Sequence, residues 1–325
     1  MSLAIISITN SCNLCCKMCD IGLKNKEGSI AKNLLSDNCI DASEWLNILR
    51  RIKAKKVHII GVEPLLYNQL EELLINIKKM GLHLSLTTNA WAFEKNKNIV
   101  AKYCDVIWIS IDGYNAETHD YNRGVSGSHT RAMKALRFLQ GKNKNVCVSF
   151  CILPNNINEI CRLNEDMVKT KTPIVFNHFN FIKTESCEGL CAQPSNLSYI
   201  NLSEFNIDNI YKAYIQCKHN AIFSPNLKTK NKIYKYYNEI PKHNKCVDRG
   251  CKIIEQLCAG ERYVISASGN LLLGNRCWME YSLGNVLDFL KSPKKQKQIQ
   301  KIANSIRKKG FPPPCQRLCC GGDLV

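Results

Sequence analysis

The feature that most constrains the fold is a repeated alternation of short apolar runs with longer amphipathic segments over residues 3–182. The apolar runs are continuous, as expected for parallel strands covered by helices; they lie at 3–9, 56–61, 82–88, 105–111, 146–153 and 174–182. The amphipathic segments lie at 41–53, 66–80, 93–103, 127–141 and 156–170. Such βα repeats predict a parallel sheet with right-handed crossovers, either an open barrel or a doubly wound sheet.

The alternation of apolar runs and amphipathic segments ends after residue 182, which predicts that the chain has three parts. We expect an α/β domain over 1–182 and a connecting segment over 183–257, with a helix near 203–217. A small cysteine-rich α+β domain is expected over 258–325, because a hairpin-like stretch (ERYVISASGNLLLG) is followed by a basic helix and a Pro-Pro-Pro-Cys segment.

Composition favours a cytoplasmic globular protein. Of 325 residues 45% are hydrophobic, yet no apolar run approaches the ~18 residues that span a bilayer. The opening MSLAIISITN lacks a basic n-region and reads as a first strand. Cytosolic thiols stay reduced, so clustered members of the 19 cysteines indicate metal or redox chemistry. The isolated Cys104, Cys147 and Cys151 are interpreted as core residues.

The net charge of +18 has two interpretations. It can attract an anionic partner such as nucleic acid, an acidic peptide or a phosphorylated sugar. Alternatively it reflects a general bias toward Ile, Asn and Lys, which run through the whole chain. In the lysine-rich stretch 291–309, Ile299, Ile302 and Ile306 share one helical face. Its lysines are therefore expected on the opposite, solvent-exposed side of a helix. We therefore do not expect a nucleic-acid partner.

A cysteine-rich loop, SCNLCCKMCD, follows the first strand. Cys12, Cys16 and Cys19 have the spacing C-x3-C-x2-C. Cysteine thiolates hold iron–sulfur clusters, normally four for a four-iron cluster, so three leave one iron open to a ligand. The same loop can also be divided into two C-x2-C pairs, Cys12 with Cys15 and Cys16 with Cys19, which could bind zinc. In structural zinc sites, however, the two cysteine pairs are usually far apart in the sequence. The cluster interpretation leaves Cys15 a bystander.

Polar motifs end the next four predicted strands. They are GVEPLL at 61–66, TTNA at 87–90, SIDG at 110–113 and LPNN at 153–156. Each alone is compatible with an ordinary turn or βα loop. Functional groups of parallel α/β barrels gather at the C-terminal ends of strands, so their joint occurrence predicts a site there.

With these motifs the chain resembles the radical S-adenosylmethionine (SAM) superfamily over residues 1–182. The resemblance implies a partial (β/α)6 TIM-like barrel and a [4Fe–4S] cluster on Cys12, Cys16 and Cys19. It implies that Glu63 binds the SAM amine, as in the family's GGEPLL, here with Val62 for the second glycine. The other implied SAM contacts are Met18 at the adenine, Gly61 in the same motif, Thr88 and Ser110 at the carboxylate and ribose, Arg123 at a carboxylate, and Asn155 at the ribose.

A second set of cysteines, Cys258, Cys277, Cys315 and either Cys319 or Cys320, could supply four ligands. Its surroundings resemble the twitch domain, the single-cluster form of the SPASM extension, although the cysteine expected four residues after the hairpin glycine is displaced to Cys277. The resemblance implies an auxiliary cluster; a zinc site and unligated thiols are alternatives. Structural, metal-binding and hydrogen-donor roles all stay open for Cys187, Cys191, Cys217, Cys246 and Cys251.

The resemblance implies that SAM is cleaved to a 5′-deoxyadenosyl radical, which abstracts a substrate hydrogen atom. The expected partners are a peptide or small-molecule substrate and an electron donor such as flavodoxin or ferredoxin. A ribosomally made peptide is the first candidate substrate, modified by oxidation, cross-linking or epimerisation. The alternatives are dehydrogenation of a sugar or aminocyclitol, RNA modification, and a non-enzymatic metal-stabilised nucleic-acid-binding protein. The last leaves Glu63 and the strand-end motifs unexplained.

Overall fold

One mixed sheet organises the part of the chain that the computed structural model describes: residues 2–19, 39–178, 202–217, 221–224, 226–239, 260–272, 282–294, 297 and 301. Its order is β10-β9-β8-β1-β2-β3-β4-β5-β6-β7, and the strands from β8 through β7 are parallel. The strands are β1 (Leu3–Ser7), β2 (Lys56–Ile60), β3 (His83–Thr88), β4 (Val106–Ser110), β5 (Asn145–Ile152), β6 (Ile174–His178), β7 (Ala221–Ser224), β8 (Arg262–Ile265), β9 (Asn270–Leu272) and β10 (Ser282–Asn285).

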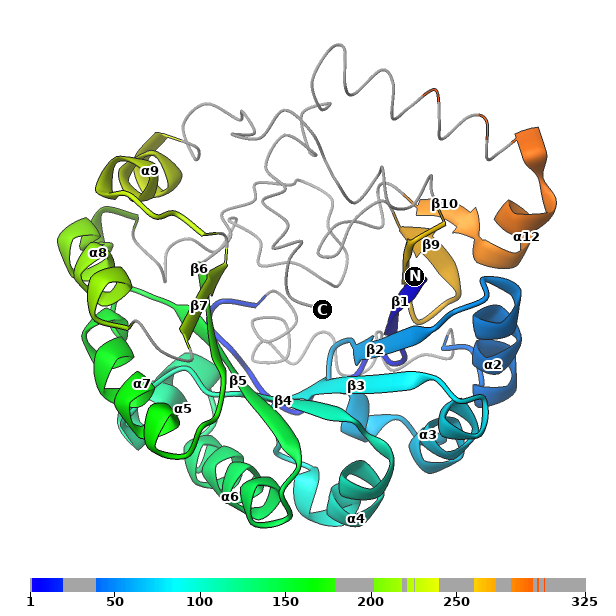
Figure 1. Cartoon of the computed structure of the whole chain (residues 1–325), viewed down its shortest axis with the longest axis horizontal. Coiled ribbons are helices and arrows are strands. Elements are labelled where there is room, and N and C mark those ends of the chain that lie inside the picture. Colours follow the sequence, from blue (N-terminus) through cyan, green and yellow to red (C-terminus); the bar gives the residue numbers. More distant parts are fainter. Residues whose placement is uncertain are drawn as a thin grey trace.

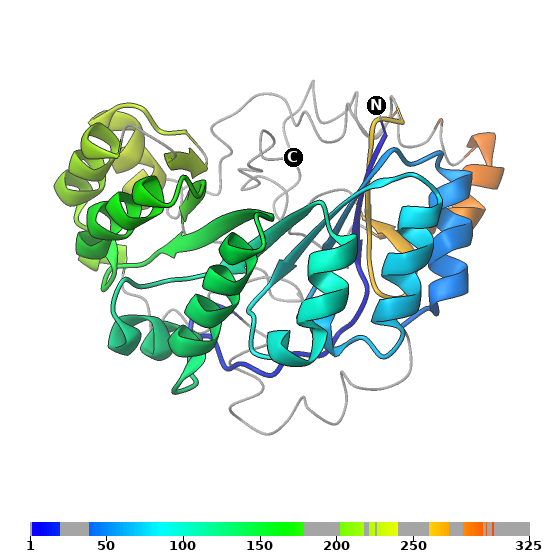
Figure 2. The same cartoon turned by 60° about the horizontal axis from the view of Figure 1, so that its bottom comes forward.

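The helices lie outside the curved sheet, as in a partial TIM-like barrel (Figures 1 and 2). This confirms the predicted α/β fold class. The helices are α2 (Ala42–Arg51), α3 (Leu70–Lys79), α4 (Phe93–Tyr103), α5 (Ala116–Arg123), α6 (Ser128–Gly141), α7 (Ile160–Lys169), α8 (Ile207–Gln216), α9 (Lys230–Tyr234) and α12 (Val286–Lys291), with short helices η1 (Pro64–Leu66), η2 (Ile157–Glu159), η4 (Leu202–Glu204) and η5 (Lys235–Glu239).

Strand alternation separates the core from the inner face of the barrel. Along β5, Val148 and Phe150 are fully buried in the core between sheet and helices. Ser149 and Cys151 are half-buried and belong to the opposite, inner face, since successive side chains of a strand point to opposite sides. Cys151 is only half-buried but packs against the core, so its interpretation as a core residue is confirmed in part.

Helix α5 was not predicted, because its sequence AETHDYNR has no apolar periodicity. A carboxylate from another element stabilises its first turn. Glu159 accepts hydrogen bonds from the main-chain N–H groups of Tyr114 and Asn115 and from the Thr118 hydroxyl. Negative charge at a helix N-terminus is favourable. A partner more than forty residues away leaves no local signal in the sequence.

The sheet extends beyond the six predicted strands at both edges. Strand β7 lies in the stretch predicted as a connecting segment and pairs in parallel with β6. The predicted hairpin forms as β8 and β9, and β8 pairs in parallel with β1. The described part of the C-terminal region thus continues the barrel sheet, while the proposed division of the chain at residue 258 stays a prediction.

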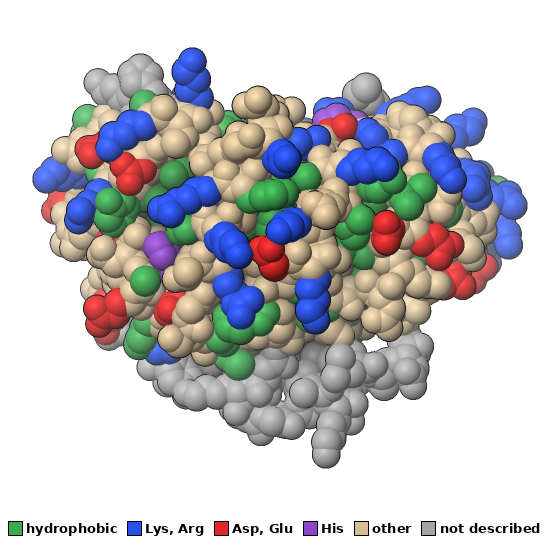
Figure 3. Space-filling model, turned by 90° about the horizontal axis from the view of Figure 1, so that it is seen from below, with side chains coloured by type: hydrophobic (Ala, Val, Ile, Leu, Met, Phe, Trp, Pro, Cys, Tyr) green, Lys and Arg blue, Asp and Glu red, His purple; other side chains and the backbone are tan. Residues whose placement is uncertain are grey.

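Charged side chains cover the outer helices without forming a single-sign field on the face in Figure 3. There, Lys and Arg are interspersed with acidic and apolar side chains. That distribution fits compositional bias on this face. In the described residues, no helix is long and apolar enough to cross a bilayer.

Candidate active site

The loop after β1 is fixed in place by the C-terminal end of α5. The Cys15 N–H donates to the Arg123 carbonyl (3.2 Å), and the Lys17 N–H donates to the Asn122 carbonyl (2.9 Å). Gly124 ends the helix with φ of +72°, and a Cβ built there would lie 2.0 Å from the Cys15 carbonyl oxygen. Only glycine permits this close approach, so the cysteine loop rests on the backbone of residues 122–124.

The three predicted ligand thiols lie near one another. Burial raises the pKa of Cys12 to about 12. Burial also raises the pKa of Cys16; Arg123 opposes this shift, and the Cys19 and Cys12 thiols add to it. The neutral forms of Cys12 and Cys16 are therefore favoured without a metal, and metal binding would release their protons. Among the described residues, no three Cys, His, Asp or Glu side chains are already arranged as metal ligands.

Glu63 is a buried carboxylate beside this loop, 1% exposed. Its Oε1 accepts from the Thr88 hydroxyl (2.6 Å) and the Leu65 N–H (3.1 Å), and its Oε2 accepts from the Asn89 N–H (2.7 Å). Burial raises its pKa, although these bonds and Arg123 oppose the shift. A carboxylate offers about four acceptor positions, so one at Oε2 is left for a ligand. The hydroxyl proton of Thr88 is already engaged with Glu63.

The motif that carries Glu63 requires a glycine. Gly61 follows β2 with φ of +135°, and a Cβ there would lie 2.7 Å from the Ser7 hydroxyl oxygen. The end of β2 thereby lies against the end of β1, where the cysteine loop begins.

Asn89 connects Glu63 to the cysteine loop. Its amide nitrogen Nδ2 lies 3.0 Å from the Asn13 Oδ1 and 3.8 Å from the Cys12 sulfur, while its main-chain N–H bonds Glu63. Sequence reasoning singled out the TTNA motif but assigned a role only to Thr88. The signal for Asn89 was its place directly after a buried strand.

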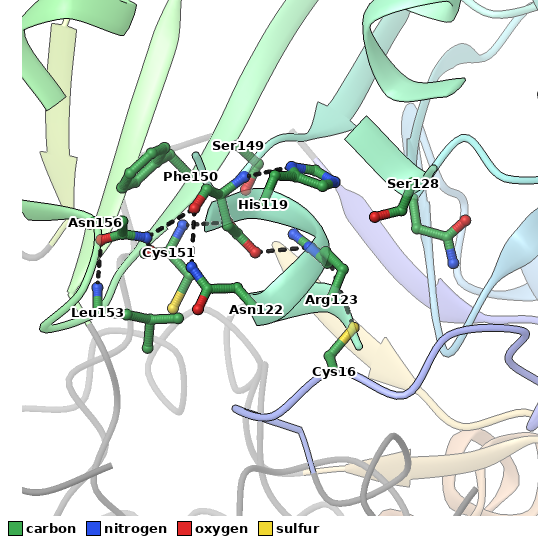
Figure 4. A network of polar contacts seen from close by, with 12 residues as sticks. Cys16, His119, Asn122, Arg123, Ser128, Ser149, Phe150, Cys151, Leu153 and Asn156 are labelled. Atoms are coloured by element: carbon green, nitrogen blue, oxygen red, sulfur yellow. Dashed lines mark hydrogen bonds and ion pairs between the residues drawn. The ribbon is translucent and has the colours of Figure 1, made fainter. Parts of the chain in front are cut away.

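A buried ion pair supports the other side of the loop (Figure 4). The Arg123 Nε lies 2.6 Å from Oδ2 of Asp112, which is fully buried, and the guanidinium reaches to 4.0 Å from the Cys16 sulfur. The other oxygen of Asp112 accepts from the Cys151 N–H (2.7 Å). Burial raises the pKa of Asp112, and Arg123 opposes the shift. Arg123, predicted to contact a SAM carboxylate, thus has a protein carboxylate as its partner here.

Asparagines hold the main chain of Asp112. Its carbonyl accepts from the amides of Asn122 and Asn156, each at 3.0 Å, and its N–H donates to the His119 Nδ1 (3.1 Å). The Asn155 amide donates to Asn122 (2.9 Å), so this predicted ribose contact stands at the same network. These bonds join the ends of β4 and β5 to α5.

Two further predicted SAM contacts occupy the same edge of the sheet. Ser110 is the last residue of β4, half-buried and in register with Ser149. Met18 is half-buried and packs against the core.

Nine cysteines lie outside the described residues: Cys258, Cys277, Cys315, Cys319, Cys320, Cys187, Cys191, Cys246 and Cys251.

Comparison with known proteins identifies the family of the part of the chain that carries this site. The family model described as the Radical SAM superfamily matches residues 6–166, which contain every site residue described above. The chain belongs to this superfamily. Membership implies a [4Fe–4S] cluster and SAM, and the site fits both: three thiols on one loop, beside a buried carboxylate with a vacant acceptor position.

Radical SAM relatives of differing chemistry match this chain. It is 28% identical over 163 residues to pre-heme d1 synthase from Dinoroseobacter shibae, covering 49% of this chain and 38% of that protein. It is 26% identical over 141 residues to PqqA peptide cyclase from Rhodopseudomonas palustris, covering 41% and 35%. The chain thus matches well under half of these curated relatives, so their activities do not transfer to it directly.

A solved structure with a similar fold is SuiB of Streptococcus suis, described bound to SAM. It superposes with a TM-score of 0.61 at 17% identity, covering 94% of this chain and 67% of that one. SuiB has also been solved bound to its precursor peptide SuiA, again with a TM-score of 0.61. At this level of sequence identity, the similarity shows a shared fold and nothing more.

Proposed function

We propose that this chain is an enzyme that binds a [4Fe–4S] cluster through Cys12, Cys16 and Cys19 and cleaves SAM reductively. When bound, the cluster and SAM supply an electron and a sulfonium whose C–S bond breaks to give methionine and a 5′-deoxyadenosyl radical. The observation that carries this proposal is the fixed position of the cysteine loop beside the buried Glu63 carboxylate, with Asn89 contacting both.

The chain's own residues position the reactants. Three thiolates anchor a cluster while leaving one iron for a ligand. The remaining acceptor position of Glu63 suits the ammonium group of SAM, because a charge-assisted hydrogen bond is among the stronger ones. Thr88 and Asn89 hold that carboxylate, and Arg123 holds the loop near Cys16.

The remaining contacts carried by the family resemblance are proposed at the same sheet edge. Met18 would pack by the adenine, and Gly61 would allow the methionyl group to approach the backbone. Ser110 and Asn155 would bind the ribose, with Thr88 near the carboxylate. Each stands at a strand end or on the cysteine loop, which is where a parallel barrel binds its ligands.

Electron paramagnetic resonance of the reduced cluster tests the assignment. Anaerobically reconstituted protein should change its spectrum when SAM is added, because SAM would bind at the iron that three thiolates leave open. Glu63→Gln should retain the cluster signal and require a higher SAM concentration for the same change. A spectrum that SAM never alters would contradict the proposal.

A ribosomally made peptide is the substrate class that we propose. Two similarities support it: PqqA peptide cyclase is a relative by sequence, and SuiB, solved with the peptide SuiA, is similar in fold. The similarity to pre-heme d1 synthase supports a non-peptide substrate as the second candidate. Synthetic peptides encoded by short reading frames beside this gene should stimulate 5′-deoxyadenosine formation and emerge with altered mass. A rate that no such peptide changes would favour the second candidate.

An auxiliary cluster on Cys258, Cys277, Cys315 and either Cys319 or Cys320 is a further part of this proposal. The resemblance to the twitch domain supports it, and four thiolates suffice to close a cluster. Such a cluster would exchange an electron with the substrate side, while a flavodoxin or ferredoxin would reduce the cluster in the barrel.

A further inference from the structure

Two cysteines that take no part in the proposed chemistry face each other on the outside of the barrel. Cys161 lies in the first turn of α7, and Cys217 follows the last residue of α8. Their sulfur atoms are 3.8 Å apart, and both thiols are free. The two helices pack together although these cysteines are separated by 56 positions, so the fold creates this pair.

Solvent reaches the pair through a surface cavity of about 510 Å³. Cys217 is buried and Cys161 is half-buried, so Cys161 is the sulfur accessible to a reagent. Asn164, a residue only 5% exposed, also lines the cavity. The lining residues are Cys161, Asn164, Glu165, Ile215, Gln216 and Cys217.

The environment favours reaction at Cys161. The hydrogen bond from the Cys217 thiol lowers the pKa of Cys161 to about 7, with Lys212 adding to the effect against burial and Glu165. A thiol that titrates near neutral pH is well suited to thiol–disulfide exchange. The Cys161 thiol donates to the Gln216 Oε1 at 3.1 Å, and rotation of the same amide would offer its N–H to a thiolate.

We propose that Cys161 and Cys217 are a modification site, at which a reversible disulfide forms by exchange with a low-molecular-weight disulfide such as oxidised glutathione. The Cys161 thiolate attacks the small disulfide, forming a mixed disulfide and releasing one small thiolate. The Cys217 thiol then loses its proton and attacks the Cys161 sulfur, releasing the second small thiol. In sum, two protein thiols are oxidised and one small disulfide is reduced to two thiols.

Peptide mapping tests this pair specifically. Cleavage after Lys, Arg and Glu isolates Cys161 in the peptide ICR (160–162) and Cys217 in AYIQCK (213–218), each with no other cysteine. The full-length protein would be equilibrated anaerobically in glutathione buffers, alkylated and digested. We expect linked ICR and AYIQCK to increase with the proportion of oxidised glutathione and to disappear after dithiothreitol. An oxidised protein without this linked pair would overturn the proposal.

Single variants test the order of attack. Cys217→Ser should trap glutathione on Cys161, because no second thiol remains to displace it. Cys161→Ser should leave the buried Cys217 unmodified. Cys39→Ser, which removes an exposed thiol elsewhere, is the matched control and should form the linked peptides as wild type does. Unmodified Cys161 in the Cys217→Ser variant would contradict the proposed mechanism even if some linked peptide forms in wild type.

Discussion

At the scale of single residues, the site depends on a few buried polar groups whose partners are fully specified. Glu63 is the clearest case, since three donors from two segments fix its carboxylate and leave one acceptor position. Asp112 and Arg123 form a second such unit, which supports the loop at Cys16. Removing one partner of a buried ion pair leaves an uncompensated charge, so neither residue is an isolated contact.

Glu63→Gln should weaken SAM binding roughly ten- to hundredfold, since a hydrogen bond to a charged group contributes about 1.5–3 kcal/mol. Its iron content after reconstitution should match that of wild type, because Glu63 is not a proposed cluster ligand. Equilibrium binding of SAM measures the effect, with Glu72→Gln on the exposed face of α3 as the control. Equal affinity for SAM in wild type and Glu63→Gln would mean that the GVEP motif is a strand-end turn without a role in SAM binding.

At the scale of elements, α5 supports the cysteine loop, and variants of two neighbouring glycines distinguish backbone strain from contact with that loop. Gly124→Ala places a methyl group against the Cys15 carbonyl, so it should displace the loop and lower iron content severalfold. Gly127→Ala imposes similar strain, with φ of +81° against +72°, but its Cβ meets nothing within 4 Å. Iron analysis should therefore separate the two variants. A similar loss in both would mean that strain, and not contact with the loop, controls the cluster.

The junction of α5 and α6 carries a pH-dependent interaction. Asp120 accepts bonds from the Gly127 and His129 N–H groups and the Ser128 hydroxyl, which cap α6. Burial alone would raise the pKa of Asp120, but these bonds bring it below its ordinary value. A lowered folded-state pKa gives stability that is present above the unfolded pKa, about 3.9, and is lost as pH falls through the folded value.

Asp120→Ala should therefore lower the unfolding free energy by about 1–2 kcal/mol at pH 7, as loss of a helix cap does. The difference from wild type should persist to pH 5 and shrink below pH ~4. Urea unfolding of the apo protein at several pH values measures it, and the exposed Glu117→Ala on the same helix should stay within about 0.5 kcal/mol of wild type. A pH-independent difference would exclude the ionised carboxylate as its source.

Many of the helices and strands could be predicted from the sequence. Long buried runs predicted β1 to β6 to within a few residues, and the amphipathic segment predicted at 41–53 contains α2, which Asp41 caps. What the sequence could not show depends on distant partners. Helix α5 needs Glu159, and the role of Arg123 depends on its side chain meeting Asp112. Strand β7 has only four residues, too few for a periodic signal.

For the whole molecule, the barrel and the proposed auxiliary cluster can be tested separately. Reconstituted wild type should bind about eight irons in two four-iron clusters. A variant with alanine at Cys12, Cys16 and Cys19 should keep about four, with a resonance signal that SAM leaves unchanged. Cys315→Ala should still cleave SAM yet fail to complete the substrate reaction. A triple variant without iron would refute the auxiliary cluster, and stoichiometric zinc in it would indicate a structural site.

The central claim is that the loop after β1 holds a cluster that cleaves SAM. The direct measurement is 5′-deoxyadenosine produced by anaerobically reconstituted protein with SAM and a strong reductant. Wild type should form it together with methionine, and Cys16→Ala should form none, because the cluster loses one of three anchors. Cys15→Ala should retain near wild-type formation, because that residue fixes the loop through its main chain. Undiminished 5′-deoxyadenosine from Cys16→Ala, or none from fully loaded wild type, would contradict the account.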